Sequence, residues 1–145
     1  MTVEDAIQAA EIEKNIFSVP WSENAFIDAI SQENNIYLAA KEEGKVVGYV
    51  GMWCVLGEGN ITNVAVAEEY RGKHIASALM EELERIGREK GTDIFFLEVR
   101  ESNQAAISLY EKCGYRYIGI RRNFYEHPVE NARIMSKTFF DNNSH

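Results

Sequence analysis

The stretch from Asn63 to Met80 constrains the fold of this chain more than any other stretch. An apolar strand ends at Val66, a short polar turn follows, and a run with helical periodicity begins near Lys73. Backbone N–H groups at the start of a helix have no partners inside the helix, and the helix dipole adds partial positive charge there. The stretch therefore predicts a strand–turn–helix unit with a site for phosphate at the helix N-terminus.

The turn has the composition that such a site needs. Gly72, Ala76 and Ser77 are small and let a ligand approach the main chain closely, while Arg71 and Lys73 add positive charge. The turn lacks the Gly-x-x-x-x-Gly-Lys-Ser/Thr pattern of a nucleoside-triphosphate loop and the Gly-x-Gly-x-x-Gly pattern of a dinucleotide fold. Many strand-to-helix turns are rich in glycine for steric reasons alone, so an ordinary turn remains the alternative.

Length and charge limit the possible functions. A chain of 145 residues is long enough for one domain with a single core and too short for two. Its formal net charge of −8 argues against nucleic-acid binding and suits a basic protein or an amine as partner. We expect no membrane segment, because the apolar runs are strand-sized, and a cytoplasmic location, because the N-terminus lacks a signal-peptide pattern. Cys54 and Cys113 have no metal-ligand spacing, so no metal is expected.

Hydrophobic periodicity and turn residues divide the chain into helical and strand-like segments. Helices are expected after the caps Thr2 and Ser22 and over residues 73–90 and 104–112. Strands are expected over residues 36–40, 45–55, 60–67, 93–99, 115–120 and 132–139. The apolar stripe of the first helix is expected to comprise Ala6, Ile7, Ala10, Ile12 and Ile16. This order predicts a single α/β domain over residues 1–140, with a mixed sheet flanked by helices and a frayed tail at residues 141–145.

Glu98 stands in the segment Asp93–Val99, which is nearly all apolar and predicts a central strand covered on both faces. A carboxylate in such a strand loses hydration and accepts a proton more readily, and a base of this kind is what amine activation requires. The alternative is a carboxylate at a strand end that pairs with Arg100 or another surface cation. The residues alone leave both interpretations open.

Tyr110 follows in a segment that runs from Asn103 to Tyr115, and a tyrosine on an amphipathic helix is most often a core or rim residue. The segment matches the pattern N-x-x-A-x-x-L-Y-x-x-x-G-F/Y at Asn103, Ala106, Leu109, Tyr110, Gly114 and Tyr115. That pattern resembles the second signature of the GNAT acetyltransferases. The turn after Val66 is similar to the first GNAT signature, R/Q-x-x-G-x-G/A, and matches it at Arg71 and Ala76. His74 departs from it, because it replaces the expected glycine.

Within the GNAT family, the chain is most similar to the ribosomal-protein-alanine N-acetyltransferases of the RimI type. The resemblance is carried by Pro20-Trp21-Ser22, by Leu97–Asn103, by Ile120–Tyr125 and by Glu130–Met135. Phe124 for Tyr and Asn131 for Asp are further departures from that pattern. The resemblance implies a GNAT fold and acetyl transfer from acetyl-coenzyme A to the N-terminal α-amine of a protein, in the best-known case the N-terminal alanine of a small-subunit ribosomal protein.

The same resemblance implies a set of site residues. Glu98 would take a proton from the amine, directly or through a water, and Tyr110 would protonate the leaving thiolate. Trp21 and Tyr125 would flank the acceptor, although ordinary packing is the alternative for Trp21. The coenzyme would be held by Val64, Ala65, Val66, Arg71, Gly72, Lys73, His74, Ile75, Ala76, Ser77 and Asn103. The competing functions are transfer to a small amine, such as a polyamine or an aminoglycoside, and a coenzyme-binding module without turnover.

Overall fold

The computed structural model describes residues 1–17 and 19–139, and within these ranges the chain forms four α-helices, one short 3₁₀ helix and six strands. In chain order they are α1 (Val3–Ile16), α2 (Glu23–Ile30), β1 (Asn35–Glu42), β2 (Lys45–Val55), β3 (Glu58–Val66), η1 (Glu68–Tyr70), α3 (Ile75–Glu89), β4 (Ile94–Arg100), α4 (Gln104–Lys112), β5 (Arg116–Tyr125) and β6 (Glu130–Thr138). The expected tail at residues 141–145 lies outside the described residues.

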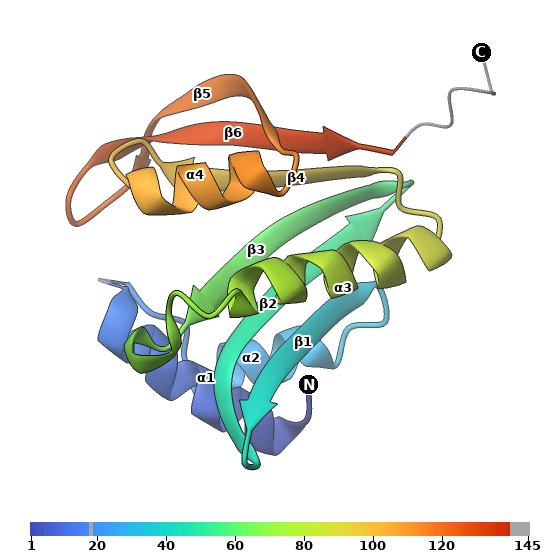
Figure 1. Ribbon diagram of the computed structural model, residues 1–145, viewed down its shortest axis with the longest axis vertical. Helices are drawn as coiled ribbons and strands as arrows, with labels where there is room; N and C mark the ends of the chain where they lie inside the picture. Colours follow the sequence, from blue (N-terminus) through green and yellow to red (C-terminus); the bar gives the residue numbers. More distant parts are fainter. Residues whose placement is uncertain (18, 140–145) are drawn as a thin grey trace.

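The strands form one mixed sheet in the order β1-β2-β3-β4-β6-β5 (Figure 1). The pairs β1/β2, β2/β3, β4/β6 and β5/β6 are antiparallel, and β3/β4 is the parallel pair at the centre. A parallel pair needs a crossover, and α3 supplies it between β3 and β4. The predicted single-domain α/β architecture with a mixed sheet is confirmed.

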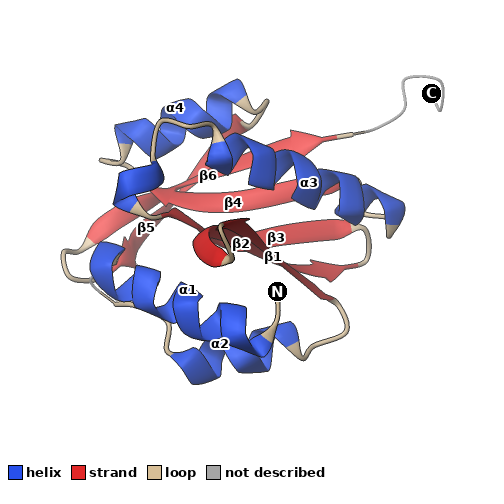
Figure 2. Ribbon diagram, turned by 60° about the horizontal axis from the view of Figure 1, so that its bottom comes forward, coloured by secondary structure: helices blue, strands red, loops and turns tan. Residues whose placement is uncertain are grey.

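Helices cover both faces of this sheet, with α1 and α2 on one side and α3 and α4 on the other (Figure 2). The larger apolar core lies under α3 and α4 and includes Met52, Leu83 and Phe95, all fully buried. The smaller core lies under α1 and α2 around Phe26 and Tyr49. Each such side chain contributes about 1.5–3 kcal/mol by leaving water.

The expectation that β4 is covered on both faces is correct for one face and wrong for the other. Phe95, Leu97 and Val99 are buried against α3 and α4, whereas the alternate residues Phe96 and Glu98 are only half-buried. The reason is that α1 packs on β2 and β3 and α2 packs on β1, so neither helix reaches fully across β4. The face of the sheet that carries Glu98 is therefore accessible from outside.

The two central strands pair over only part of their length. The β3–β4 ladder ends at Ile61 and Leu97, although β3 continues to Val66 and β4 to Arg100. An extra residue in β3, Thr62, lies where the register with β2 shifts, and such a bulge bends a strand and increases its twist. Each strand keeps its outer partner, so the two separate toward the start of α3 (Figure 1). Beyond Ile61 and Leu97 the facing edges of the two strands no longer pair with each other, and this splayed region is called the opening below.

The first two helices begin at the predicted caps. Thr2 and Asp5 form a capping box at α1, and the Ser22 hydroxyl accepts a hydrogen bond from the N–H of Ala25 at α2. The stripe predicted for α1 is partly wrong, because Ile7 is 44% exposed while Glu13 is only 3% exposed. A carboxylate thus occupies a position that periodicity assigns to an apolar side chain.

Candidate active site

The turn between β3 and α3 has the geometry expected of an anion-binding helix start. His74 is the N-cap of α3 in a left-handed conformation, with φ at 62°, and its side chain makes no capping hydrogen bond. Gly72 also has a positive φ, of 79°. The first N–H groups of α3, at Ile75, Ala76 and Ser77, therefore receive no side-chain cap from His74 and point away from the helix body. The predicted strand–turn–helix unit is present.

Two cations flank this turn. The Nε of Arg71 donates a hydrogen bond to the carbonyl oxygen of Val66 at 3.2 Å, which ties the turn to the end of β3. The Nζ of Lys73 lies 5.1 Å from the ring centroid of Tyr70. Val64 is half-buried and points toward the α3 core, whereas Ala65 is buried in the core under α1. The positive side chains and the uncapped helix start thus lie at one end of the opening between β3 and β4.

Glu98 lies one residue beyond the last β3–β4 pair, at the edge of that opening. One carboxylate oxygen, Oε1, is 3.3 Å from the Nε of Arg121, and the Glu98 side chain is 29% exposed. The other oxygen, Oε2, is buried and has no hydrogen-bond partner among the described residues. The alternative of an ion pair therefore applies to one oxygen, with Arg121 rather than Arg100 as the partner, and the second oxygen makes no hydrogen bond within the described residues.

Tyr125 lies within electrostatic range of Glu98, and Tyr110 lies within electrostatic range of Tyr125. Burial raises the pKa of Tyr125 to about 12, and the negative charge of Glu98 adds to that increase. Tyr110 is 7% exposed on α4, and burial raises its pKa above the ordinary phenol value, with a smaller contribution from Tyr125. Both phenols therefore keep their protons at neutral pH. Tyr110 is a core residue, as is usual for a tyrosine on an amphipathic helix, and it carries a proton that it could donate.

Asn103 begins α4, the helix that carries Tyr110. Its Oδ1 accepts a hydrogen bond from the N–H of Ala106 at 3.1 Å, so the side chain acts as the N-cap. This cap determines where the helix starts and hence the position of Tyr110.

The segment from Tyr125 to Glu130, hereafter the Tyr125 loop, is held by Arg100 on β4. The Arg100 guanidinium donates to the carbonyl oxygens of Glu126 at 2.9 Å and Pro128 at 3.0 Å and lies 4.5 Å from the Tyr125 ring centroid. It also pairs with the Glu130 carboxylate at 3.2 Å. The second oxygen of Glu130 accepts from the N–H of Ser102. One cation thus connects the end of β4, the approach to α4 and the Tyr125 loop.

Trp21 lies in the connection between α1 and α2, hereafter the Trp21 loop. Its ring centroid is 5.3 Å from that of Phe26 and 6.4 Å from that of Tyr37, so ordinary packing accounts for part of its position. Its backbone N–H donates a hydrogen bond to the Oε2 of Glu13 at 3.2 Å. The connection is therefore attached to α1 through a buried carboxylate.

Sequence reasoning missed Glu13 and Asn63 and named Arg100 only as a possible partner of Glu98. A signal for Glu13 exists, because it lies four and seven residues after Ala9 and Ala6, at the spacing of one helix face. No comparable local signal points to Arg100, whose partner Glu130 is thirty residues away.

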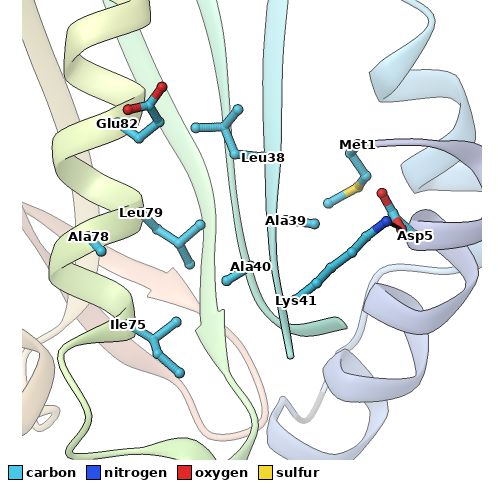
Figure 3. Close-up of a pocket in the computed structure, with 10 residues that line it drawn as sticks. All are labelled: Met1, Asp5, Leu38, Ala39, Ala40, Lys41, Ile75, Ala78, Leu79 and Glu82. Atoms are coloured by element: carbon cyan, nitrogen blue, oxygen red, sulfur yellow. Dashed lines mark ion pairs between the residues drawn. The ribbon is translucent and has the colours of Figure 1, made fainter. Parts of the chain in front are cut away.

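A separate hollow lies at the outer edge of the sheet and does not include Glu98 (Figure 3). It has a volume of about 460 Å³ and lies over β1 between α3 and the start of α1. Of the predicted site residues only Ile75 lines it, and an ion pair between Lys41 and Asp5, at 2.8 Å, borders it.

Neither a metal cluster nor a membrane span occurs in residues 1–17 and 19–139. No three or more His, Cys, Asp and Glu side chains of these ranges are grouped as metal ligands would be. None of the helices there is both long and apolar enough to cross a bilayer.

Comparisons with known proteins agree on one family. A profile of the Acetyltransferase (GNAT) family matches residues 6–115. The chain is 36% identical over 123 residues to the ribosomal protein bS18-alanine N-acetyltransferase of Escherichia coli, which covers 83% of this chain and 81% of that protein.

Solved structures give the same result. The crystal structure of the ribosomal-protein-S18-alanine N-acetyltransferase from Escherichia coli has a TM-score of 0.89 and 32% identity, over 97% of this chain and 92% of that one. An aminoglycoside 6′-N-acetyltransferase complexed with coenzyme A has a TM-score of 0.82 over 94% of this chain and 91% of that chain. Its identity is only 16%, so it shows a shared fold and nothing more.

Proposed function

This chain belongs to the GNAT acetyltransferase family, and we propose that it transfers the acetyl group of acetyl-coenzyme A to the N-terminal alanine of a small-subunit ribosomal protein. The enzyme of Escherichia coli that it resembles is named for that acceptor. One observation carries the proposal. Glu98 lies one residue past the last β3–β4 pair, at the edge of the opening, and its Oε2 has no hydrogen-bond partner in the described residues.

The start of α3 suits the diphosphate of a coenzyme. Uncapped N–H groups at residues 75–77 and the cations Arg71 and Lys73 offer hydrogen bonds and charge to an anion. Positive φ at Gly72 and His74 lets the main chain curve around a phosphate. Acetyl-coenzyme A supplies the activated acetyl group, and the small side chains at Ala76 and Ser77 leave room for it against the helix. Asn103, at the start of α4, would contact the same molecule on its other side.

The other end of the opening suits an amine. Glu98 would take a proton from the α-ammonium of the acceptor, whose reference pKa near 8 makes the transfer mild. The free amine then attacks the thioester carbonyl. Backbone N–H groups at Val64–Val66 would stabilise the oxyanion, a contribution often of about 3 kcal/mol.

Tyr110 would complete the reaction by giving its proton to the departing sulfur. Burial raises the pKa of Tyr110, so the phenol holds its proton at neutral pH, although the same shift makes it a weaker acid. The acceptor would lie between Trp21 and Tyr125, and we place the enzyme in the cytoplasm, where ribosomal proteins are made. A coenzyme-binding module without turnover would need neither Glu98 nor Tyr110.

A panel of acceptors tests this function. Peptides that begin Ala-Arg should be acetylated on the α-amine, as mass spectrometry of the product would establish, while the same peptides with a blocked N-terminus should not react. Spermidine and an aminoglycoside form the competing arms. Higher kcat/KM for either of these than for the peptides would overturn the proposed acceptor, and turnover of neither class would overturn the enzyme assignment.

A further inference from the structure

Glu13 on α1 is a buried carboxylate that the proposed reaction does not use. It is 3% exposed, and no Lys, Arg or His of the described ranges lies within ion-pair distance of it. Its Oε2 accepts a hydrogen bond from the backbone N–H of Trp21 at 3.2 Å, and its Oε1 accepts from the Nδ2 of Asn63 at 3.3 Å. A carboxylate without a cation is costly to bury, so its presence calls for a reason.

The neighbours of Asn63 determine which atom it presents to Glu13. The Oδ1 of Asn63 accepts hydrogen bonds from the hydroxyl of Tyr37 at 3.1 Å and from that of Thr62 at 2.7 Å. The amide nitrogen must then face Glu13, and Glu13 meets a donor at each oxygen. Only an ionised carboxylate accepts fully at both oxygens, because a protonated acid or an amide has a donor at one of them.

These contacts link two parts of the acceptor side. Asn63 follows the Thr62 bulge, where β3 leaves β4, and it faces α1. Glu98 faces the same side of the sheet, because it alternates with Leu97 and Val99 of the opposite core. Glu13 therefore connects the backbone of Trp21 to the strand that forms one edge of the opening.

We infer that Glu13 is a positioning residue, which in its ionised form holds the Trp21 backbone against β3 and so shapes the acceptor side of the opening. This inference rests on the proposed function, in which the acceptor lies against Trp21. The carboxylate touches no reacting atom and acts through the two groups that it binds.

Protonation of Glu13 at low pH should release the backbone of Trp21 from its carboxylate. Burial raises the pKa of Glu13 above the ordinary carboxyl value of 4.5. The ionisable groups that face it are the phenols of Tyr37 on β1 and Tyr49 on β2, and burial raises both of their pKa values, with a further increase from the charge of Glu13. Neither phenol titrates below about pH 9. Of these three groups, Glu13 is therefore the one that gains a proton as the pH falls, with a pKa above 4.5.

The solvent accessibility of Trp21 can be measured without any catalytic turnover. The chain has two tryptophans, and Trp53→Phe removes the exposed one, so that Trp21 becomes the sole tryptophan and its emission can be excited selectively over that of the tyrosines. In this background, acrylamide quenching of Trp21 should rise about twofold as the pH falls, with a midpoint above 4.5. Adding Glu13→Gln should abolish this transition and give the higher quenching at every pH, because the amide can accept from only one of the two donors.

Steady-state kinetics test the connection to the acceptor. Glu13→Gln should raise the KM of the alanine-starting peptide about tenfold, while kcat falls less than about twofold and the Kd of acetyl-coenzyme A stays the same. The matched control is Glu11→Gln, which makes the same change on the same helix at a side chain that is 71% exposed and pairs with Lys14. The control should change neither the quenching nor the KM.

The possible outcomes separate this inference from the proposed function. Equal quenching in wild type and Glu13→Gln would overturn the inference, and so would altered quenching with an unchanged peptide KM. If Glu13→Gln does not fold, a flat quenching profile in the Trp53→Phe protein alone would overturn it. If the wild type acetylates no peptide, the proposed function fails, and the role in acceptor positioning is overturned with it even where the quenching transition is present.

Discussion

The two loops that flank the proposed acceptor side of the opening, the Tyr125 loop and the Trp21 loop, are held by opposite chemistry. The Tyr125 loop is anchored by Arg100, which donates to two loop carbonyls, pairs with Glu130 and lies over the Tyr125 ring. The Trp21 loop is anchored by one buried carboxylate, Glu13, which has only neutral donors as partners. Arg100 makes several hydrogen bonds and an ion pair, so the position of the Tyr125 loop depends little on any one of them. The position of the Trp21 loop depends on whether the single carboxylate of Glu13 is ionised.

The pKa values of Glu130 and Glu13 shift in opposite directions, as this difference between the two anchors predicts. Hydrogen bonds from Ser102, followed by the contacts with Arg100, lower the pKa of Glu130 below 4.5. Its contribution to stability is therefore present above about pH 4.5 and is lost as the pH falls through the lowered value. Burial raises the pKa of Glu13, so its ionisation lowers stability as the pH rises from about 4.5 through the raised value. Ionisation of Glu13 at the Trp21 loop thus lowers the stability of the fold, whereas ionisation of Glu130 at the Tyr125 loop raises it.

The largest effect is expected at Glu98, between the two loops. Glu98→Gln should lower kcat by about tenfold to a hundredfold with little change in peptide KM, because proton transfer contributes about 10² to 10⁴ in rate. The acidic limb of the pH profile of kcat/KM should disappear or shift, whereas Tyr110→Phe, the matched variant at the thioester end, should keep it. Wild-type activity in Glu98→Gln would show that solvent deprotonates the amine.

The next largest effect should come from Arg100. Arg100→Ala removes all contacts of the Tyr125 loop with its anchor, so the peptide KM should rise about tenfold. Because the contacts with Ser102 and Arg100 lower the pKa of Glu130, its carboxylate stays ionised at neutral pH, and this loss should be the same from about pH 6 to pH 9. Arg116→Ala, an exposed arginine on β5, serves as the control in the same KM measurements. If the rise in peptide KM in Arg100→Ala varied with pH in this range, the anchor of the Tyr125 loop would be pH-dependent too, and the contrast with the Trp21 loop would be wrong.

A smaller effect is expected on the coenzyme side, which neither loop reaches. Changing Arg71 and Lys73 together to Ala should raise the Kd of acetyl-coenzyme A about fivefold, as measured by calorimetry, and more at low salt because exposed charges are screened. In the wild type the coenzyme should raise the melting temperature by mass action. Undiminished binding in the double variant would place the diphosphate elsewhere.

The smallest effect is expected at His74. Its left-handed φ of 62° is a conformation that glycine adopts without strain, so His74→Gly should stabilise the protein by about 0.5–1 kcal/mol in urea unfolding. His74→Ala is the control, because alanine meets the same steric restriction and should bring no such gain. Equal stability of the two variants would show that the loop does not strain this residue.

The regions that sequence reasoning predicted well are those in which neighbours along the chain decide the structure. The capping box of α1 joins residues three apart, and the turn from Val66 to His74 is one continuous segment. The poorly predicted features concern burial. Ile7 was assigned to the core and is exposed, and β4 was expected to be covered on both faces, because periodicity does not say how far a helix extends across a sheet.

By itself the sequence determined the order of helices and strands, the family and the start of α3, since caps, periodicity and motifs act over a few residues. Only the tertiary structure decided that β3 and β4 separate after Ile61 and Leu97, that Glu98 pairs with Arg121, and that Arg100 and Glu13 anchor two different loops. These contacts join residues far apart in the chain. Whether they form depends on strand register, the Thr62 bulge and the position of α1, and no local pattern encodes these.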